Sequence, residues 1–302
     1  MTAPRWGAEQ MSGSRNDDLR GEASPEAEPV DGLSDDEVDS VDERRSGSPK
    51  VVHEVIRLQG DEELGRPLAS LLFSGFAAGV AISASILAEA FLHERLPEAP
   101  WAELVSSLGY SVGFVIVIMG NLQLFTENTV TAVLPLATHP TRRNLGRLLR
   151  LWAAVFAANM AGTLFVALLV SRQIIVGPEQ LSATLEVSRS VLRHDAMATL
   201  MLGMPAGFLV ASIAWILPNA RGSEFWVIVL ITYVIALGGF THVVAGSGEA
   251  WLLWLHGEVG LSDAVGRLIL PSLLGNIIGG TGLFAVLAHG QVHGELDPGE
   301  DE

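Results

Sequence analysis

The sequence GNLQLFTEN, residues 120–128, lies inside an apolar block that extends from residue 105 to residue 137. A second polar and glycine-rich stretch, GGFTH at residues 238–242, lies in the same way inside the apolar block 225–255. Both blocks are longer than the roughly 20 residues that one straight membrane-spanning helix needs. Irregular backbone is tolerated at membrane depth only where protein buries it or where it lines a cavity. The two stretches therefore predict two broken membrane spans beside a cavity.

Four further apolar blocks have the length of a membrane span, at residues 68–92, 148–170, 196–217 and 265–288. Hydrophobic residues make up 49% of the chain and charged residues only 17%, which is unusual for a soluble protein of 302 residues. With the two broken blocks, the pattern predicts an all-α membrane protein with six transmembrane helices, of which the second and fifth are broken.

The net charge of −16 is concentrated outside the apolar blocks. We expect a disordered acidic tail over residues 1–50, because it holds too little apolar surface to fold. Residues 51–67 are either a short amphipathic helix or a linker, residues 68–290 form the six-span domain, and residues 291–302 form a second acidic tail. The chain has no cysteine and no His-Glu-x-x-His motif, so we expect no disulfide, no metal and no cofactor. The expected partners are the lipid bilayer and a small solute, and no nucleic acid.

Basic residues gather in the loop after the second span, at residues 142–150. Cytoplasmic loops carry an excess of Lys and Arg. With an even number of spans this loop lies on the same side as both termini. We therefore expect both termini in the cytoplasm and a multi-pass protein in a bacterial-type inner membrane.

The two halves of the six-span domain carry the same small motifs in the same order. The pairs are Gly75-x-x-x-Gly79 with Gly203-x-x-x-Gly207, Phe125-Thr126 with Phe240-Thr241, and Asn159-x-x-Gly162 with Asn276-x-x-Gly279. Three spans in each half place the second copy upside down in the membrane, which predicts an inverted repeat. In such repeats, interrupted segments at corresponding positions mark the transport site.

These motifs resemble those of the formate/nitrite transporter family. The resemblance rests on Leu124-Phe125-Thr126, on a Gly-Phe-x-His sequence that ends at His242, and on GNIIGG at residues 275–280, and it covers residues 66–290. It implies an aquaporin-like 3+3 fold, a homo-pentamer with one pore in each protomer, and a channel for small monovalent weak-acid anions rather than an enzyme. It also implies that Thr126 and His242 face each other in the pore.

The sequence departs from the formate channels at several positions. Gln123 stands where those channels have an acidic residue before the Leu-Phe-Thr motif, and Glu127 supplies an acid after it. A lysine near the outer end of the fourth span is absent, with Arg193 the nearest cation, and Gly207 replaces a polar asparagine. The chain resembles more closely a branch of the family that carries Leu-Phe-Thr-Glu-Asn.

His242 is the first candidate for a pore residue, since an ionisable side chain inside a span is costly and its proton exchanges near neutral pH. The alternative is a neutral histidine that bonds between helices. Thr126 offers a hydroxyl to the pore, or else bonds back to a preceding carbonyl group. The remaining predicted pore residues are Leu124, Phe125, Phe240 and Thr241.

Other residues are predicted to shape the pore rather than to contact the solute. Tyr110, Phe114 and Ile235 are candidates for an apolar constriction, although plain packing explains them as well. Glu127, Asn128, Asn159 and Asn276 are predicted to support the two irregular stretches, Glu127 by capping a half-helix.

Two other functions compete with anion transport. An aquaporin-like channel for small neutral solutes would share the fold class. An intramembrane serine protease would use Ser247, which lies in the Ala-Gly-Ser-Gly sequence 245–248, together with His289.

Overall fold

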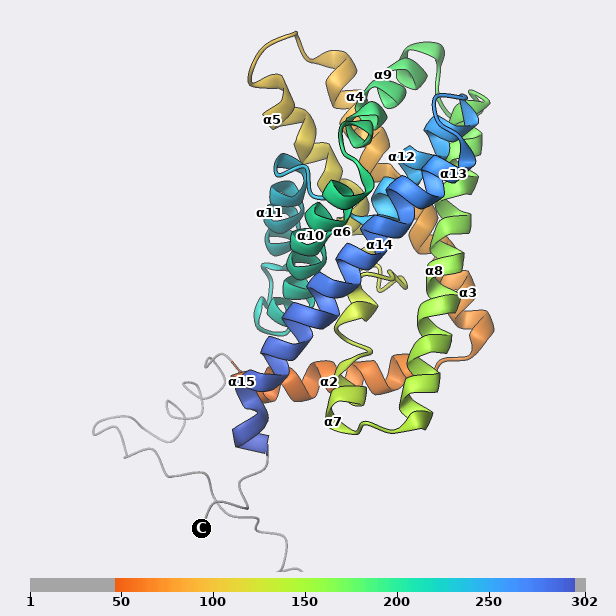
Figure 1. Ribbon diagram of the computed structural model, residues 1–302. Coiled ribbons are helices and arrows are strands. Elements are labelled where there is room, and N and C mark those ends of the chain that lie inside the picture. Colours follow the sequence, from red (N-terminus) through yellow and green to blue (C-terminus); the bar gives the residue numbers. More distant parts are fainter. Residues whose placement is uncertain (1–46, 297–302) are drawn as a thin grey trace, which may run out of the picture. The chain divides into compact units, whose positions relative to one another are not determined.

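The computed structural model describes residues 47–296, and these residues form helices and no strand (Figure 1). The predicted acidic tail over residues 1–50 lies almost wholly outside this range, and so do residues 297–302. Within the described range five helical stretches are long and apolar enough to cross a membrane, at Leu68–Arg95, Ala102–Met119, Arg142–Ser171, Ala196–Asn219 and Leu261–Val292. The predicted fifth span consists of two shorter apolar helices, Glu224–Leu237 and Val243–Leu255.

The elements of the first half follow the predicted spans. They are α2 (Pro49–Gly65), α3 (Leu68–Ile82), α4 (Ala84–Arg95), α5 (Ala102–Ser106), η1 (Ser107–Tyr110), α6 (Ser111–Met119), η2 (Glu127–Thr129), α7 (Leu134–Thr138) and α8 (Arg142–Ser171). The first span is interrupted at Ser83, whose hydroxyl donates to the carbonyl oxygen of Gly79 at 2.9 Å. Such back-bonding by serine commonly bends a helix.

The second half has the same order of spans. Its elements are α9 (Pro178–Ser188), η3 (Arg189–Arg193), α10 (Ala196–Ile216), η4 (Leu217–Asn219), α11 (Glu224–Leu237), α12 (Val243–Leu255), α13 (Leu261–Asp263), η5 (Ala264–Ile269), α14 (Leu270–Ile277), η6 (Ile278–Ala285) and α15 (Val286–Leu296). Both η5 and η6 are π-helical, so the sixth span is a continuous helix with two widened segments.

The predicted breaks are confirmed. Helix α6 ends at Met119 and no α-helix follows before α7, while α11 ends at Leu237 and α12 begins only at Val243. The two halves differ after the break, because α12 has 13 residues whereas α7 has only five.

Glycines allow the helices of each half to pack at backbone contact distance. A Cβ atom on Gly79 of α3 would lie 2.3 Å from the carbonyl oxygen of Asn159 of α8. A Cβ atom on Gly207 of α10 would lie 2.3 Å from the carbonyl oxygen of Asn276 of α14. No side chain fits at either distance, so both crossings require glycine.

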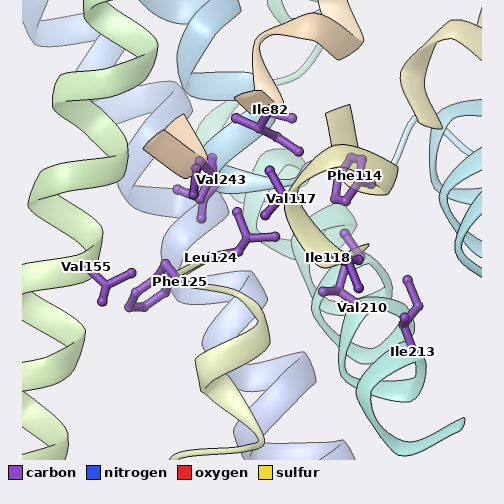
Figure 2. Packing of buried hydrophobic residues seen from close by; sticks show 14 of the residues in the cluster. Ile82, Phe114, Val117, Ile118, Leu124, Phe125, Val155, Val210, Ile213 and Val243 are labelled. Atoms are coloured by element: carbon purple, nitrogen blue, oxygen red, sulfur yellow. The ribbon is translucent and has the colours of Figure 1, made fainter. Parts of the chain in front are cut away.

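The core lies where the broken spans meet. Figure 2 shows Leu124, Phe125 and Val243 from the two breaks together with Ile82, Phe114 and Val117, and all of these side chains belong to one buried hydrophobic cluster.

Helix α2 lies across the end of the bundle where α7 and α15 are found (Figure 1), and it contacts both of them as well as α8. Its buried face is formed by Val52, His53, Ile56, Gly60 and Leu64. Arg150 of α8 donates to the carbonyl oxygens of Leu64 at 2.9 Å and Arg66 at 3.0 Å. The basic side chain therefore satisfies carbonyl groups that the end of α2 leaves without partners.

Candidate functional site

The two breaks begin with the same backbone conformation. At the first, the amide groups of Gly120, Asn121 and Leu122 donate to the carbonyl oxygens of Ile116, Ile118 and Val117. At the second, Gly238, Gly239 and Phe240 donate in the same pattern to Val234, Ala236 and Ile235. Asn121 and Gly239 both have a positive φ, of 48° and 60°, which is the left-handed conformation that commonly ends a helix.

One asparagine fixes the backbone after each break. Asn159 accepts a hydrogen bond from the amide of Phe125 at 2.9 Å and donates to the carbonyl oxygens of Gly75 at 2.7 Å and Gln123 at 2.9 Å. This side chain is fully buried. All three contacts hold main-chain groups that would otherwise be unsatisfied inside the membrane.

Asn276 makes the equivalent three contacts in the second half. It accepts from the amide of Val243 at 2.8 Å and donates to the carbonyl oxygens of Gly203 at 2.9 Å and Thr241 at 2.8 Å. These contacts pair Asn159 with Asn276, as the sequence predicts, and they support the inverted repeat.

The same contacts correct the predicted register of the two breaks. Gln123 corresponds to Thr241 and Phe125 to Val243, so that Leu124 corresponds to His242. The recurrence of Phe-Thr at residues 125–126 and 240–241 is therefore not a structural equivalence, since the two copies are offset by three positions. A dipeptide match is too short to fix register when polar contacts of the backbone decide it.

His242 is the N-cap of α12. Its Nδ1 accepts a hydrogen bond from the amide of Ala245 at 3.2 Å. Because an amide N–H can only donate, Nδ1 carries no hydrogen, and the proton of the neutral ring lies on Nε2. Nε2 lies 2.7 Å from Oγ1 of Thr126, so the ring donates to the hydroxyl. The prediction that these two residues lie within hydrogen-bond distance is confirmed.

The Thr126–His242 contact is closed off from solvent. Thr126 is fully buried and His242 is 2% exposed. The edge of Phe114 packs against the imidazole ring with a centroid distance of 4.9 Å, and Tyr110 packs against Phe114 at 5.1 Å. The contact therefore joins the two halves of the repeat in a mostly apolar environment.

A cavity of about 980 Å³ leads to this contact from the end of the bundle that carries α4, α5 and α9. His242, Thr241, Phe240, Tyr110 and Ile235 line it, whereas Thr126, Leu124, Phe125 and Phe114 do not. The predicted pore and constriction residues therefore divide into a group at the floor of the cavity and a group buried beneath it.

Several predicted pore residues make packing or hydrogen-bond contacts within the protein. The ring of Phe125 packs against Trp152 and Phe156 of α8 at 5.8 and 5.3 Å between centroids. Leu124 is 1% exposed within the core. The hydroxyl of Thr241 donates to the carbonyl oxygen of Thr199 at 2.6 Å, so it is turned toward α10.

The loop after the first break is tied to α2 by a contact that the sequence did not predict. The side-chain amide of Gln123 donates to a carboxylate oxygen of Glu63 at 2.5 Å, and its side-chain carbonyl accepts from Asn128 at 3.1 Å. Asn128 thus supports the loop as predicted. The carboxylate of Glu127 accepts no hydrogen bond from any residue in the described range, so it does not cap a half-helix there. The sequence could not predict the contact between Gln123 and Glu63, because the two residues are 60 positions apart.

The proposed serine and histidine of a protease do not meet. Ser247 is bonded to the hydroxyl of Thr163 at 2.8 Å and to the carbonyl oxygen of Val244 at 2.7 Å. His289 lies in α15 beside His53 of α2, at 3.1 Å between ring nitrogens. The protease alternative is therefore wrong.

Comparison with known proteins agrees with this geometry. Inner membrane protein YfdC of Escherichia coli is 39% identical over 257 residues, which cover 85% of this chain and 83% of that protein. The formate channel FocA of Haemophilus influenzae is 24% identical over 71% of this chain and 84% of that protein. A solved pentameric formate channel with formate bound has a TM-score of 0.63 at 21% identity, over 75% of this chain and 97% of that one.

The sequence profile of the formate/nitrite transporter family matches residues 50–290, which are nearly all of the described structure. The match includes both breaks, both asparagines and the contact between Thr126 and His242. This chain belongs to the formate/nitrite transporter family, and it is a transmembrane transport protein rather than an enzyme.

Proposed function

We propose that the chain carries small monovalent weak acids of the formate and nitrite type across the membrane, and that they pass between Thr126 and His242. The observation that carries the proposal is the buried 2.7 Å contact between these side chains, which joins the two breaks below the floor of the cavity. Family membership gives the class of solute, and the formate channels among the similar proteins agree with it.

The contact offers a passing solute two polar groups in an apolar surrounding. The Nε2–H of His242 is a donor, and the Thr126 hydroxyl is both donor and acceptor. A carboxylate or nitrite oxygen can replace Thr126 as the acceptor of the ring proton while the hydroxyl donates to it. The solute thus exchanges part of its hydration shell for protein hydrogen bonds, which lowers the cost of leaving water.

His242 acts as a hydrogen-bond donor in this mechanism and keeps its proton. A second proton on the ring would have to bind Nδ1, which is occupied by the amide of Ala245. It would also place a positive charge at the N-terminus of α12, where the helix dipole is already positive. This differs from our sequence-based expectation that the histidine exchanges its proton near neutral pH.

Passage requires the Thr126–His242 bond to open, since the cavity ends there. Phe114 and Ile235, both fully buried, leave little space for water around the contact. The uncharged form of a weak acid crosses such a place at lower cost than its anion. We place the protein in the inner membrane as a homo-pentamer, with the end that bears α2 in the cytoplasm, on the strength of the similar proteins and of the basic residues near α2.

The test is flux into proteoliposomes that contain the purified protein, measured for formate, nitrite and water. We expect formate and nitrite to enter faster than into protein-free liposomes, while water entry stays at the protein-free rate. Rapid water entry without weak-acid entry would instead support the neutral-solute channel and would overturn this proposal.

A further inference from the structure

The first break is held by the sixth span as well as by Asn159. The hydroxyl of Thr281 in η6 donates to the carbonyl oxygen of Thr129 at 2.5 Å. The hydroxyl of Thr129 in turn donates to the carbonyl oxygen of Thr126 at 2.6 Å. Thr129 and Thr126 are fully buried, while Thr281 is half-buried. These two hydrogen bonds, which we call the threonine link, lead from the sixth span to the residue that contacts His242.

Gly280 provides the space for the threonine link. A Cβ atom on Gly280 would overlap the hydroxyl oxygen of Thr129, so any larger residue would push that side chain aside. Gly282 lies in the same segment, and a Cβ atom there would lie 3.9 Å from a methyl group of Ile278, which is an ordinary contact. Both glycines belong to η6, and such π-helical segments are rare and are frequently found at functional sites. Close packing against Thr129 therefore explains the glycine at position 280.

The threonine link acts on the main chain of Thr126. The carbonyl oxygen of Thr126 accepts from the hydroxyl of Thr129 at 2.6 Å and from its amide at 3.4 Å. Both bonds fix the main chain in the 3₁₀ turn. A β-branched side chain has few rotamers, so a fixed main chain leaves the Thr126 hydroxyl few positions. The position that it takes is 2.7 Å from Nε2 of His242.

The sixth span also holds the other member of this contact. Asn276 bonds the main chain of Thr241 and Val243, the two neighbours of His242. Asn276 lies in α14, which continues directly into η6. One span therefore supports the main chain on both sides of the contact between Thr126 and His242, and it sets how far apart the two side chains lie.

The second half contains an equivalent of the threonine link. In the register that the two asparagines define, Ser247 corresponds to Thr129 and Val244 corresponds to Thr126. The hydroxyl of Ser247 donates to the carbonyl oxygen of Val244 at 2.7 Å, and it lies 2.8 Å from the hydroxyl of Thr163 in the third span. Both halves therefore fix the main chain at this position. Val244 has no polar side chain, so only the first half brings a hydroxyl to the contact.

We infer that Thr281 and Gly280 are positioning residues for the pore. They act through Thr129 and place the hydroxyl of Thr126 opposite the ring of His242. The inference rests on the proposed function, because it names residues that prepare the contact where solutes pass. Without the threonine link, the Thr126 hydroxyl is present but displaced. A passing carboxylate or nitrite oxygen then loses the hydrogen bond from it.

The test is a double-mutant cycle on formate flux into proteoliposomes, with the flux normalised to the amount of assembled protein. Thr281→Val removes the hydroxyl, and we expect it to lower the flux about threefold, within the range for one hydrogen bond. Thr126→Val alone should lower it about tenfold. Thr281→Val should have no further effect in the Thr126→Val background, because the hydroxyl that it positions is gone. Independent effects would multiply to about thirtyfold.

A conservative substitution distinguishes the hydrogen bond from packing. Thr281→Ser keeps the hydroxyl that donates to Thr129, so it should restore the flux to near the wild-type value. A residue needed only for packing would show the opposite order, because serine loses the methyl group whose volume valine keeps.

The two glycines of η6 give a matched pair that does not depend on Thr281. Gly280→Ala should displace Thr129 and lower the flux about threefold or more, again only while Thr126 is present. Gly282→Ala adds the same methyl group at ordinary contact distance and should keep the wild-type flux. This pair decides the question even if Thr281→Val fails to assemble.

The outcomes separate the inference from the proposed function. A wild type that takes up no weak acid, or a flux that Thr126→Val leaves unchanged, overturns the proposed function and this inference with it. If Thr126→Val lowers the flux but Thr281→Val and Gly280→Ala do not, only the inference is overturned. The same holds if their effects multiply with that of Thr126→Val. In both cases the threonine link supports the fold and not the pathway.

Discussion

The two breaks share a backbone but differ in the chemistry that they carry. Each begins with a left-handed residue, Asn121 or Gly239, and each is held by one buried asparagine with three main-chain contacts. The asparagines donate to the carbonyl oxygens of Gln123 and Thr241. The residue that follows is Leu124 in the first break and His242 in the second. The two breaks therefore have the same backbone arrangement, and a single position gives the second break its polar side chain.

The same position decides whether a long helix begins after the break. His242 caps α12, which continues for 13 residues. Leu124 has no polar side chain to cap a helix, and the sequence TENTVTAV after it is rich in β-branched residues. Thr129 and Thr131 bond back to the carbonyl oxygens of Thr126 and Glu127, which competes with helix formation. The first break therefore continues as a short 3₁₀ turn that brings Thr126 to the histidine.

The largest effect is expected from removing either asparagine. Asn159→Leu and Asn276→Leu each leave three buried main-chain groups without partners, at about 1–3 kcal/mol for each group. Both variants should lose the assembled protein in detergent, as measured by size-exclusion chromatography. Loss of assembly in only one of them would contradict the claim that the two asparagines have equivalent roles in the two halves.

The glycine crossings should show a smaller, matched effect. Gly79→Ala and Gly207→Ala each place a methyl group 2.3 Å from a carbonyl oxygen of the asparagine-bearing helix. Such overpacking costs about 1–3 kcal/mol, which exceeds the helix propensity that alanine adds. Both should lower the midpoint of thermal unfolding in detergent. Gly248→Ala is the control, because a Cβ atom there has no neighbour within 4 Å, and its midpoint should stay the same or rise.

Substitutions of His242 distinguish its role as the N-cap of α12 from its role as a hydrogen-bond donor to Thr126. His242→Phe keeps an aromatic ring but removes the cap of α12, which should cost about 0.5–2 kcal/mol of stability. His242→Asn can accept from Ala245 and should keep most of that stability. Both should lose weak-acid flux, because neither presents the Nε2–H to Thr126. Normal flux through the phenylalanine variant would identify the histidine as a packing residue.

Much of the fold could be predicted from the sequence because length and hydropathy decide where spans lie. The glycine and polar residues at 120–128 and 238–242 lie inside apolar blocks, so they indicate an interruption of the helix at membrane depth. The register of the repeat could not be predicted, since it depends on which carbonyl each asparagine reaches. The contact of α2 with the first break could not be predicted either, because Glu63 and Gln123 are 60 residues apart.

The contacts of the candidate site were also predicted only in part. The pairing of Thr126 with His242 was predicted, but through a resemblance and not through spacing. Capping by His242 was not predicted, although a polar residue directly before VVAGSGEAW is a recognisable helix start. The hydrogen bond from the Thr241 hydroxyl to Thr199 could not be predicted either, because Thr199 lies in another span.

The most direct test of the account compares Thr126→Val with Thr241→Val, which remove the same atom from the two breaks. Both hydroxyls are hydrogen-bonded, one with His242 at 2.7 Å and one with the carbonyl oxygen of Thr199 at 2.6 Å. We predict that Thr126→Val lowers formate flux into proteoliposomes about tenfold, the equivalent of one hydrogen bond of about 1.4 kcal/mol, while Thr241→Val leaves the flux near the wild-type value. Equal flux through the two variants would contradict the claim that solutes pass at the Thr126–His242 contact.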